Sequence, residues 1–245
     1  MTKRQKARII WLSIALGMGI LILGCAIFLC TYYKADENIE ESFPLSDVVT
    51  REDNDDFTAF IPNGKATAGF IFYPGGKVDA EAYTPLLSAL AEYGILSVVA
   101  KMPFRLAFFD VNAADEIREA YPEIENWYIG GHSLGGSMAA FHLAKNENDF
   151  EGLVLLGSYS TKDLSKTNVA ALSIYGSNDG VMNRNKYEKN RSNLPNEFSE
   201  LVIDGGNHAG FGAYGKQKGD GEATVTNAEQ IYVTASHIYL FITSP

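Results

Sequence analysis

A serine flanked by glycines lies near the middle of the chain, where Gly131-His132-Ser133-Leu134-Gly135 follows the run WYIG and opens the run LGGSMAAFHLA. A G-x-S-x-G spacing between a strand and a helix is the pattern of a nucleophile elbow, in which the serine occupies a strained turn. Side chains at positions 131 and 135 would collide with the neighbouring strand and helix. We therefore predict that Ser133 is a nucleophile; the alternative is a glycine-rich turn with a surface serine.

A serine nucleophile needs a base to take its proton, and the chain has four histidines. His208 follows the apolar run LVID in the glycine-rich loop 205–210, at the expected carboxyl end of a strand. It also comes last in the chain order of serine, acid and histidine that this kind of triad follows. His132 adjoins the serine, where neighbouring side chains diverge, and His142 and His237 lie inside expected helices. We therefore predict that His208 is the base.

The imidazole needs a carboxylate that orients it and stabilises its protonated form. An apolar run predicts a strand between the serine and the histidine, and Asp179 lies in the loop Ser177–Val181 that follows this strand. Asp163 is the second candidate, whereas Asp204 is too close to His208 in the sequence. The Asn-Asp-Gly sequence around Asp179 also forms turns by itself, which is the structural alternative.

The oxyanion of a tetrahedral intermediate needs hydrogen-bond donors. The backbone N–H of Leu134, directly after the nucleophile, is one expected donor. The second is expected from the loop Pro74–Lys77, which follows the apolar run AGFIFY. Its glycine pair lets the backbone approach a substrate, and Gly76 is preferred to Lys77 as the donor. An ordinary strand-to-helix turn is the alternative for this loop.

The substrate pocket is harder to read from the sequence. The segment between residues 157 and 172 is too short for a helical lid, so we expect an open site. The side chains expected to contact the substrate are Lys77, Tyr159 and Phe211. Further aromatic candidates are Phe104, Phe108 and Tyr214, each of which is also consistent with ordinary packing. The loop 215–221 looks organised, but no role for it follows from the sequence.

Apolar runs alternate with segments of helical spacing through most of the chain. The expected strands are 68–73, 95–101, 127–130, 153–157, 172–176 and 201–204, and residues 47–50 and 57–61 are expected to form an opening hairpin. The expected helices are 80–93, 111–121, 134–145, 182–193 and 228–241. Near-continuous apolar strands that alternate with helices predict an α/β fold, with a mostly parallel sheet covered on both faces. In such sheets the site lies beyond the carboxyl ends of the strands.

The N-terminal region has the composition of a membrane anchor. Residues 9–30 are apolar and uncharged, and a helix of this length, at about 1.5 Å per residue, crosses a bilayer core of about 30 Å. Four lysines and arginines precede this segment within residues 1–8, and mainly acidic residues follow it. The positive-inside rule then predicts a cytoplasmic N-terminus and an extracytoplasmic body. The alternatives are a cleaved signal peptide and a lipoprotein signal. The residues Ile22–Cys25 loosely resemble the cleavage box of a lipoprotein signal.

These features predict four parts: a basic N-terminus (1–8), a transmembrane helix (9–30), an acidic tether (31–45) and a catalytic domain (46–245). The net charge is −10 although the first thirty residues are basic, so the body is strongly acidic. An acidic body argues against a nucleic-acid partner, which requires a basic face. The two cysteines, Cys25 and Cys30, lie in the apolar segment, so the domain has no thiolate metal site. We expect no metal and no cofactor, and the Gly75-Gly76-Lys77 turn lacks phosphate-loop spacing.

Four motifs together resemble the α/β-hydrolase superfamily: YPGG (73–76), GGHSLGG (130–136), YGSNDGV (175–181) and GGNHAGFG (205–212). The chain resembles small lidless members of the dienelactone-hydrolase-like and bacterial membrane-anchored esterase type. The resemblance covers about residues 57–245 and implies the α/β-hydrolase fold. Two departures stand out: fewer clear strands than the family's eight, and Ser133 where dienelactone hydrolases have cysteine. The specific activity of those enzymes is therefore not expected here.

The sequence thus predicts a membrane-anchored serine hydrolase that forms an acyl-enzyme on Ser133. It is expected to cleave an ester-type bond in a small molecule, with thioesters and amides as alternatives. The lipid bilayer is an expected partner through residues 9–30, as a single-pass protein of the cell membrane. An acyltransferase on the same triad and a non-catalytic binding domain that retains the fold are the alternative functions.

Overall fold

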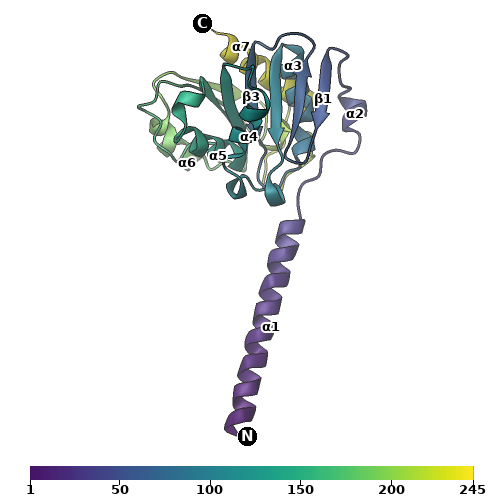
Figure 1. Cartoon of the computed structure of the whole chain (residues 1–245), viewed down its shortest axis with the longest axis vertical. Coiled ribbons are helices and arrows are strands. Elements are labelled where there is room, and N and C mark those ends of the chain that lie inside the picture. Colours follow the sequence, from purple (N-terminus) through teal and green to yellow (C-terminus); the bar gives the residue numbers. More distant parts are fainter. Residues whose placement is uncertain (245) are drawn as a thin grey trace. The chain divides into compact units, whose positions relative to one another are not determined.

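The structure, a computed structural model, describes residues 1–244 (Figure 1). The chain forms two compact units, Met1–Tyr32 and Tyr33–Pro245.

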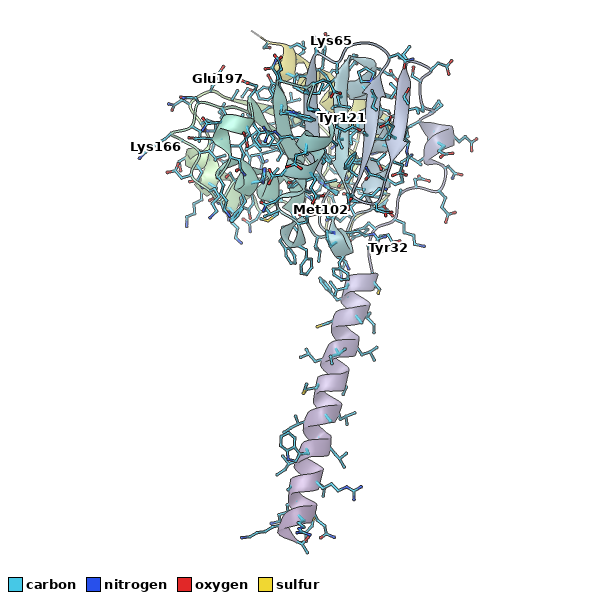
Figure 2. All side chains as sticks on the ribbon, in the orientation of Figure 1. Tyr32, Lys65, Met102, Tyr121, Lys166 and Glu197 are labelled. Atoms are coloured by element: carbon cyan, nitrogen blue, oxygen red, sulfur yellow. The ribbon has the colours of Figure 1, made fainter. Side chains whose placement is uncertain are left out.

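The first unit is a single helix of 28 residues, α1 (Lys3–Cys30). Thr2 caps its N-terminus, because its hydroxyl oxygen accepts from the N–H of Gln5 (3.3 Å) while the Gln5 side chain accepts from the N–H of Thr2 (2.8 Å). The side chains of α1 radiate outwards and none is buried (Figure 2). The helix is long and apolar enough to cross a membrane, a property that signal sequences share, and it contains the whole predicted segment 9–30.

The second unit begins at Tyr33, earlier than the boundary at residue 46 expected from the sequence. The N–H of Tyr33 donates to the carbonyl of Lys77 (2.7 Å), and the N–H of Asp79 donates to the carbonyl of Tyr33 (2.9 Å). Slightly further on, the N–H of Asp36 donates to the carbonyl of Ala213 (2.8 Å). Within the acidic segment expected to be a tether, Tyr33 and Asp36 are therefore bonded to the rest of this unit.

The strands of the second unit are β1 (Val49–Asp53), β2 (Phe57–Pro62), β3 (Ala68–Tyr73), β4 (Ile95–Ala100), β5 (Trp127–His132), β6 (Gly152–Leu156), β7 (Ala170–Gly176) and β8 (Phe198–Ile203). Within residues 1–244 they form one eight-stranded sheet in the order β1-β2-β4-β3-β5-β6-β7-β8. Strand β2 pairs antiparallel with β1 and β4, and the other neighbouring pairs are parallel. The predicted mostly parallel sheet is confirmed.

Helices cover both faces of the sheet, as predicted (Figure 1). The helices of this unit are α2 (Ile39–Ser42), α3 (Thr84–Glu92), α4 (Ala113–Ala120), α5 (Leu134–Leu143), α6 (Arg184–Asn190) and α7 (Asn227–Thr243). Short 3₁₀ turns are η1 (Ala80–Tyr83), η2 (Pro103–Arg105), η3 (Ala107–Phe109), η4 (Glu147–Asp149), η5 (Arg191–Asn193) and η6 (Ala209–Phe211). Helices α3 and α7 pack together over one face, and α4 and α5 lie over the other.

Strand β3 explains why the central strands read as continuous apolar runs. All six of its residues are buried. Phe70 and Phe72 belong to the core under α3 and α7, whereas Ile71 and Tyr73 belong to the core under α4 and α5. Because a strand covered on both faces has no solvent side, it has no polar alternation.

The carboxyl ends of the parallel strands meet at one edge of the sheet, and the predicted site residues all follow such ends. Gly76 follows β3, Ser133 follows β5, Asp179 follows β7 and His208 follows β8. This edge is where open α/β sheets place their ligand sites. Residues that are far apart in the sequence are thereby brought to one place.

Candidate active site

The turn between β5 and α5 holds Ser133 in a left-handed backbone conformation, with φ +52° and ψ −118°. A Cβ at Gly131 would lie 2.4 Å from the carbonyl oxygen of Tyr73, and one at Gly135 would lie 2.1 Å from the same oxygen. Both overlaps are with backbone, so only glycine fits at these two positions. The N–H of Ser133 donates to the carbonyl of Leu156 (2.9 Å), which fixes the turn against β6. The elbow geometry is thus enforced by sterics, as the motif predicts.

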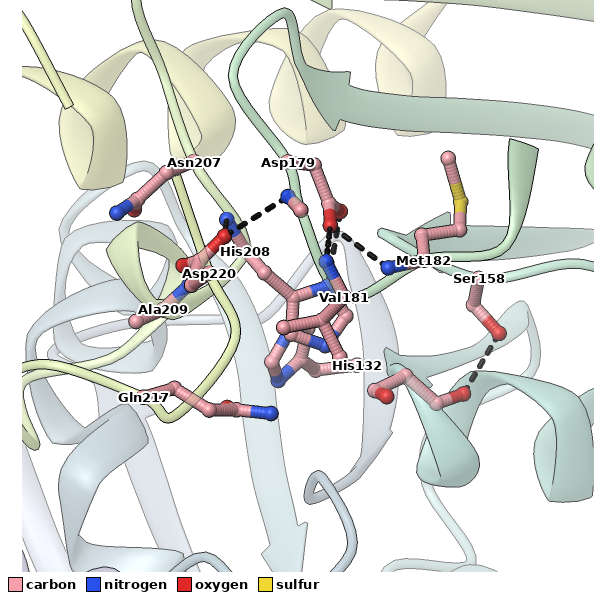
Figure 3. Close-up of polar contacts among 12 residues, drawn as sticks. His132, Ser158, Asp179, Val181, Met182, Asn207, His208, Ala209, Gln217 and Asp220 are labelled. Atoms are coloured by element: carbon pink, nitrogen blue, oxygen red, sulfur yellow. Dashed lines mark hydrogen bonds and ion pairs between the residues drawn. The ribbon is translucent and has the colours of Figure 1, made fainter. Parts of the chain in front are cut away.

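His208 and Asp179 are joined directly, since Nδ1 of His208 lies 2.8 Å from Oδ2 of Asp179 (Figure 3). The other carboxylate oxygen, Oδ1 of Asp179, accepts from the backbone N–H groups of Val181 (2.9 Å) and Met182 (2.8 Å). An ionised carboxylate only accepts, so His208 carries its proton on Nδ1 and donates it to Asp179. The two backbone bonds hold the carboxylate with one oxygen aimed at the imidazole.

The end of β6 brings the serine to this pair. Gly157 has φ +51°, and a Cβ there would lie 2.9 Å from Nδ1 of His208 and 3.1 Å from Oδ2 of Asp179. The next residue, Ser158, donates from its hydroxyl to the carbonyl of Ser133 (2.7 Å). Two consecutive residues therefore contact all three members of the predicted triad. The absence of a side chain at Gly157 provides the room that the acid–base pair occupies.

The second ring nitrogen of His208, Nε2, is not used by the pair with Asp179. The imidazole is 1% exposed, and Nε2 has no hydrogen-bond partner among the described residues. With the proton on Nδ1, Nε2 has a free lone pair. A buried acceptor without a partner is costly in a folded protein, and a catalytic role is one recognised reason for it.

His132, next to Ser133, packs against His208. Its ring lies 4.4 Å from the ring of His208, and its Nδ1 lies 2.8 Å from the hydroxyl of Tyr83. That hydroxyl accepts from the N–H of Gly75 (3.0 Å), and burial raises the pKa of Tyr83, so the phenol donates its own proton to His132. Burial, and then the neighbouring His208, hold the pKa of His132 well below its usual value. His132 is therefore a neutral support and not a second base.

The two expected oxyanion donors lie side by side. A Cβ at Gly76 would be 2.9 Å from the Cδ2 atom of Leu134, so the loop after β3 rests on the residue after the nucleophile. The N–H of Lys77 donates to the carbonyl of Arg105 (2.8 Å), and the N–H of Gly75 is bonded to Tyr83. These bonds engage the donors on either side of Gly76. The structure therefore favours Gly76 over the alternative donor Lys77.

The other candidate residues differ in their exposure and in their contacts. Asp163 is exposed and accepts from the N–H (3.0 Å) and hydroxyl (2.6 Å) of Ser165, so it is not next to the base. The expectation that Phe211 contacts the substrate is not supported. Its side chain is fully buried, with its ring 5.6 Å from that of His132, so it supports the site from within the core. Tyr159 is half-buried and packs against the cluster that contains Tyr175.

The aromatic candidates before α4 form an exposed cluster. Phe104 is 53% exposed and Phe108 is 51% exposed, so both are available to a ligand, whereas Tyr214 is buried. Phe109 joins the two, with ring centroids 5.5 Å from Phe104 and 4.3 Å from Phe108. The hydrogen bond between Lys77 and Arg105 joins this cluster to the loop Pro74–Lys77, which is called the oxyanion loop because it carries the expected donor Gly76. An apolar surface thus lies next to the proposed donors.

A cavity of about 590 Å³ also adjoins the oxyanion loop. Its apolar wall includes Pro74, Met102 and Pro103, and its polar wall includes Asp56 and Asp79. Its size is within the range of small-molecule pockets. This cavity is not predictable from the sequence, because its walls come from three separate loops.

Two polar residues that no motif marks hold the loop that carries His208. The side chain of Gln230, on α7, accepts from the N–H of Asn207 (3.0 Å) and donates to its carbonyl (2.7 Å). The carboxylate of Asp220 accepts from the N–H of His208 in the same loop (3.2 Å). No sequence motif marks either residue, because each acts on a loop more than ten residues away.

The chain matches a family model described as "Alpha/beta hydrolase family" over residues 69–232. This segment contains Gly76, Ser133, Asp179 and His208. The match confirms the α/β-hydrolase fold expected from the motifs. No curated protein sequence matches the chain.

Solved structures share the fold at low sequence identity. Est1E from Butyrivibrio proteoclasticus superposes with a TM-score of 0.59 at 13% identity, covering 81% of this chain and 100% of that chain. Est1E with bound ferulic acid gives a TM-score of 0.61 at 12% identity, covering 81% and 98%. TT1662 from Thermus thermophilus gives 0.58 at 17% identity, covering 80% and 99%. At these identities the similarity shows the fold alone.

Proposed function

We propose a serine-hydrolase mechanism for this chain, which belongs to the alpha/beta hydrolase family. Family membership and the fold support hydrolase activity in general. Ser133 is proposed as the nucleophile, His208 as the base and Asp179 as the carboxylate that orients it. The proposed reaction is the hydrolysis of a carboxylic ester.

The observation that carries this proposal is the bonded pair of His208 and Asp179 beside a serine in a strained turn. Asp179 fixes the imidazole with its proton on Nδ1, so Nε2 takes the proton of the Ser133 hydroxyl as Oγ attacks the carbonyl carbon. The protonated His208 then gives this proton to the departing alcohol. Water, deprotonated by the same nitrogen, releases the acid from the acyl-enzyme.

Charge that develops on the carbonyl oxygen is proposed to be stabilised by the N–H groups of Gly76 and Leu134. Leu134 is also the first residue of α5, so the oxygen lies at the positive end of a helix dipole. Because these donors are fixed by the fold before the reaction, they need no reorganisation during it. Removal of one donor of this type typically costs about 10²–10³-fold in kcat.

An apolar or aromatic ester is the substrate class that the surroundings support best. The exposed cluster of Phe104, Phe108 and Phe109 offers flat apolar surface beside the proposed oxyanion donors. Ferulic acid, which is bound in one structure of the related fold, is an aromatic carboxylic acid. We therefore propose aryl or other apolar carboxylic esters as substrates.

The direct test is covalent labelling with a fluorophosphonate probe. Wild-type protein should be labelled, mass spectrometry should place the adduct on Ser133, and labelling should abolish turnover of a 4-nitrophenyl ester. Ser133→Ala should take up no label, while Ser165→Ala, a serine on an exposed loop, should be labelled like the wild type. An unlabelled wild type, or a labelled Ser133→Ala variant, would refute the proposed mechanism.

We propose that α1 is an uncleaved membrane anchor with a cytoplasmic N-terminus. Support comes from its length and hydropathy, and from the basic residues Lys3, Arg4, Lys6 and Arg8 at its start. The domain is then extracytoplasmic. In intact cells stripped of any outer wall, added protease should digest the domain. Protection until lysis would contradict the orientation, and mature protein lacking residues 1–30 would contradict the anchor.

A further inference from the structure

The loop Gly215–Gly221, for which the sequence suggests no role, returns to the proposed active site (Figure 3). Its residue Asp220 accepts four backbone N–H groups. Oδ1 accepts from His208 (3.2 Å), from Gly180 (3.0 Å) and from Gly221 (2.9 Å), and Oδ2 accepts from Ala209 (2.8 Å). One carboxylate therefore bonds both the loop of the proposed acid and the loop of the proposed base.

The backbone around Asp220 is packed against the acid loop without spare room. A Cβ at Gly221 would lie 2.0 Å from the carbonyl oxygen of Asn178, and one at Gly180 would lie 2.7 Å from that of Gly219. A side-chain hydrogen bond joins the same two segments, because the Asn178 side chain donates to the carbonyl of Glu222 (2.9 Å). The position of the carboxylate is therefore fixed by its surroundings as well as by its own bonds.

We propose that Asp220 is a positioning residue that sets the relative placement of Asp179 and His208 and contributes a negative charge at the backbone of His208. This proposal rests on the serine-hydrolase function proposed above. The bond to Gly180 acts on the residue after Asp179, and the bond to His208 acts on the base itself. A carboxylate suits this role because each of its oxygens accepts several N–H groups, whereas an amide offers one acceptor.

The charge of Asp220 has a consequence that packing alone does not have. A negative group near an imidazole favours its protonated form. The other titratable groups around the ring are Asp179, which is bonded to Nδ1, and His132, whose ring packs on it, with Tyr214 behind His132. Loss of the Asp220 charge should therefore move the acid limb of the kcat/KM profile to lower pH.

The test compares Asp220→Asn with the matched control Glu222→Gln, using full-length protein in detergent and a 4-nitrophenyl ester. Asp220→Asn should lower kcat by about 10–100-fold with little change in KM, because misplaced catalytic groups affect the transition state and not ground-state binding. Its acid limb should move down by roughly half a pH unit. Glu222 directly follows the loop Gly215–Gly221 and is paired with Lys216 at the surface, so its variant should match the wild type.

Asp220→Glu separates charge from position. It keeps the charge but displaces the carboxylate by one methylene, so kcat should fall while the acid limb stays at its wild-type pH. This variant also carries the test if Asp220→Asn does not fold, as judged from its thermal transition. Wild-type kcat in a folded Asp220→Asn or Asp220→Glu protein would overturn the proposal. Equal shifts of the acid limb in Asp220→Asn and Glu222→Gln would also overturn it, because net charge would then be the cause.

Failure of the Asp220 proposal is distinguishable from failure of the proposed function. If the wild type carries the fluorophosphonate adduct on Ser133 and the Asp220 variants behave like it, only the role of Asp220 is wrong. If the wild type is neither labelled nor active, the proposed function itself is wrong.

Discussion

The elbow between β5 and α5 positions Ser133 through backbone overlap, whereas the loops after β7 and β8 position Asp179 and His208 through hydrogen bonds. At the elbow, glycines allow backbones to meet at distances that no side chain tolerates. In the loops, the side chains of Asp220 and Gln230 reach back from later parts of the chain. The first arrangement relies on close backbone packing of one turn against β3, and the second adds side-chain hydrogen bonds from later parts of the chain to close packing of its own.

This difference implies different responses to mutation. An overlap with backbone cannot relax without moving a strand, so an altered elbow should lose stability first. A hydrogen-bonded loop can shift by a fraction of an ångström and remain folded, so altered loops should lose activity first. Mutations in the two regions should therefore separate loss of stability from loss of activity.

Replacement of the nucleophile should separate activity from stability most clearly. Ser133→Ala should reduce kcat by at least about 10⁴-fold, the scale seen when a triad serine is removed. Ser133→Gly should be as inactive, yet more stable than Ser133→Ala by about 1 kcal/mol, because glycine adopts φ +52° without strain. Ester assays and urea unfolding measure both quantities. If the glycine variant is the less stable of the two, the turn does not store strain.

Replacement of the acid should inactivate the enzyme through the wrong histidine tautomer. In Asp179→Asn the amide oxygen can still accept from Val181 and Met182, which turns the amide NH₂ towards His208. Nδ1 must then accept, so the proton moves to Nε2 and the base is lost. We expect kcat to fall by about 10³–10⁴-fold. The control Asp163→Asn should stay within about twofold of wild type, and the reverse result would make Asp163 the acid.

An added methyl group at the elbow should destabilise the fold. Gly135→Ala places a Cβ 2.1 Å from the carbonyl of Tyr73, and we expect the free energy of unfolding to fall by about 3 kcal/mol or more. Gly94→Ala is the control, because Gly94 has φ +87° but no atom within 4 Å of a Cβ. It should lose only about 1 kcal/mol, the cost of backbone strain. Equal losses measured by urea unfolding would show that strain, not overlap, dominates at the elbow.

The buried His132 should make stability fall in mild acid. Because its folded pKa is lowered, below about pH 6.5 the unfolded chain binds a proton that the native protein does not. The free energy of unfolding should therefore fall by about 1.4 kcal/mol for each pH unit below that point, and recover above it. His132→Gln should show a smaller loss between pH 7 and pH 5 in urea titrations. The partly exposed His237→Gln is the control, and an unchanged loss in the His132 variant would contradict this account.

The contrast between the two regions also explains what the sequence could predict. Ser133, its glycines and the flanking strand and helix lie within a few residues of one another, so a short motif describes them. The parallel sheet was predictable for a similar reason, because double burial leaves continuous apolar runs such as residues 68–73. Asp179 and His208 were identified from strand order, since each follows the end of an apolar run.

The features that the sequence did not reveal depend on contacts between distant segments. Asp220 acts on residues 180 and 208, and no periodicity connects these positions. Phe211 follows the base in a loop and looks available to a ligand, yet the fold buries it beneath His132. The segment from Tyr33 to Asp36 has the composition of a tether, but its backbone bonds to Lys77 and Ala213 are invisible in composition.

The pairing of α3 with α7 has a consequence for biosynthesis. Leu86, Leu87 and Leu90 of α3 belong to the same core as Ile231 and Ile238 of α7, although well over a hundred residues separate the two helices. A chain emerging from the ribosome therefore carries an uncovered apolar helix for most of its synthesis, a state prone to aggregation. The covering helix also brings Gln230, which holds the base loop. Helix α7 therefore both covers the core and holds the loop of the proposed base. A nascent chain that lacks α7 should need a chaperone and have no hydrolase activity.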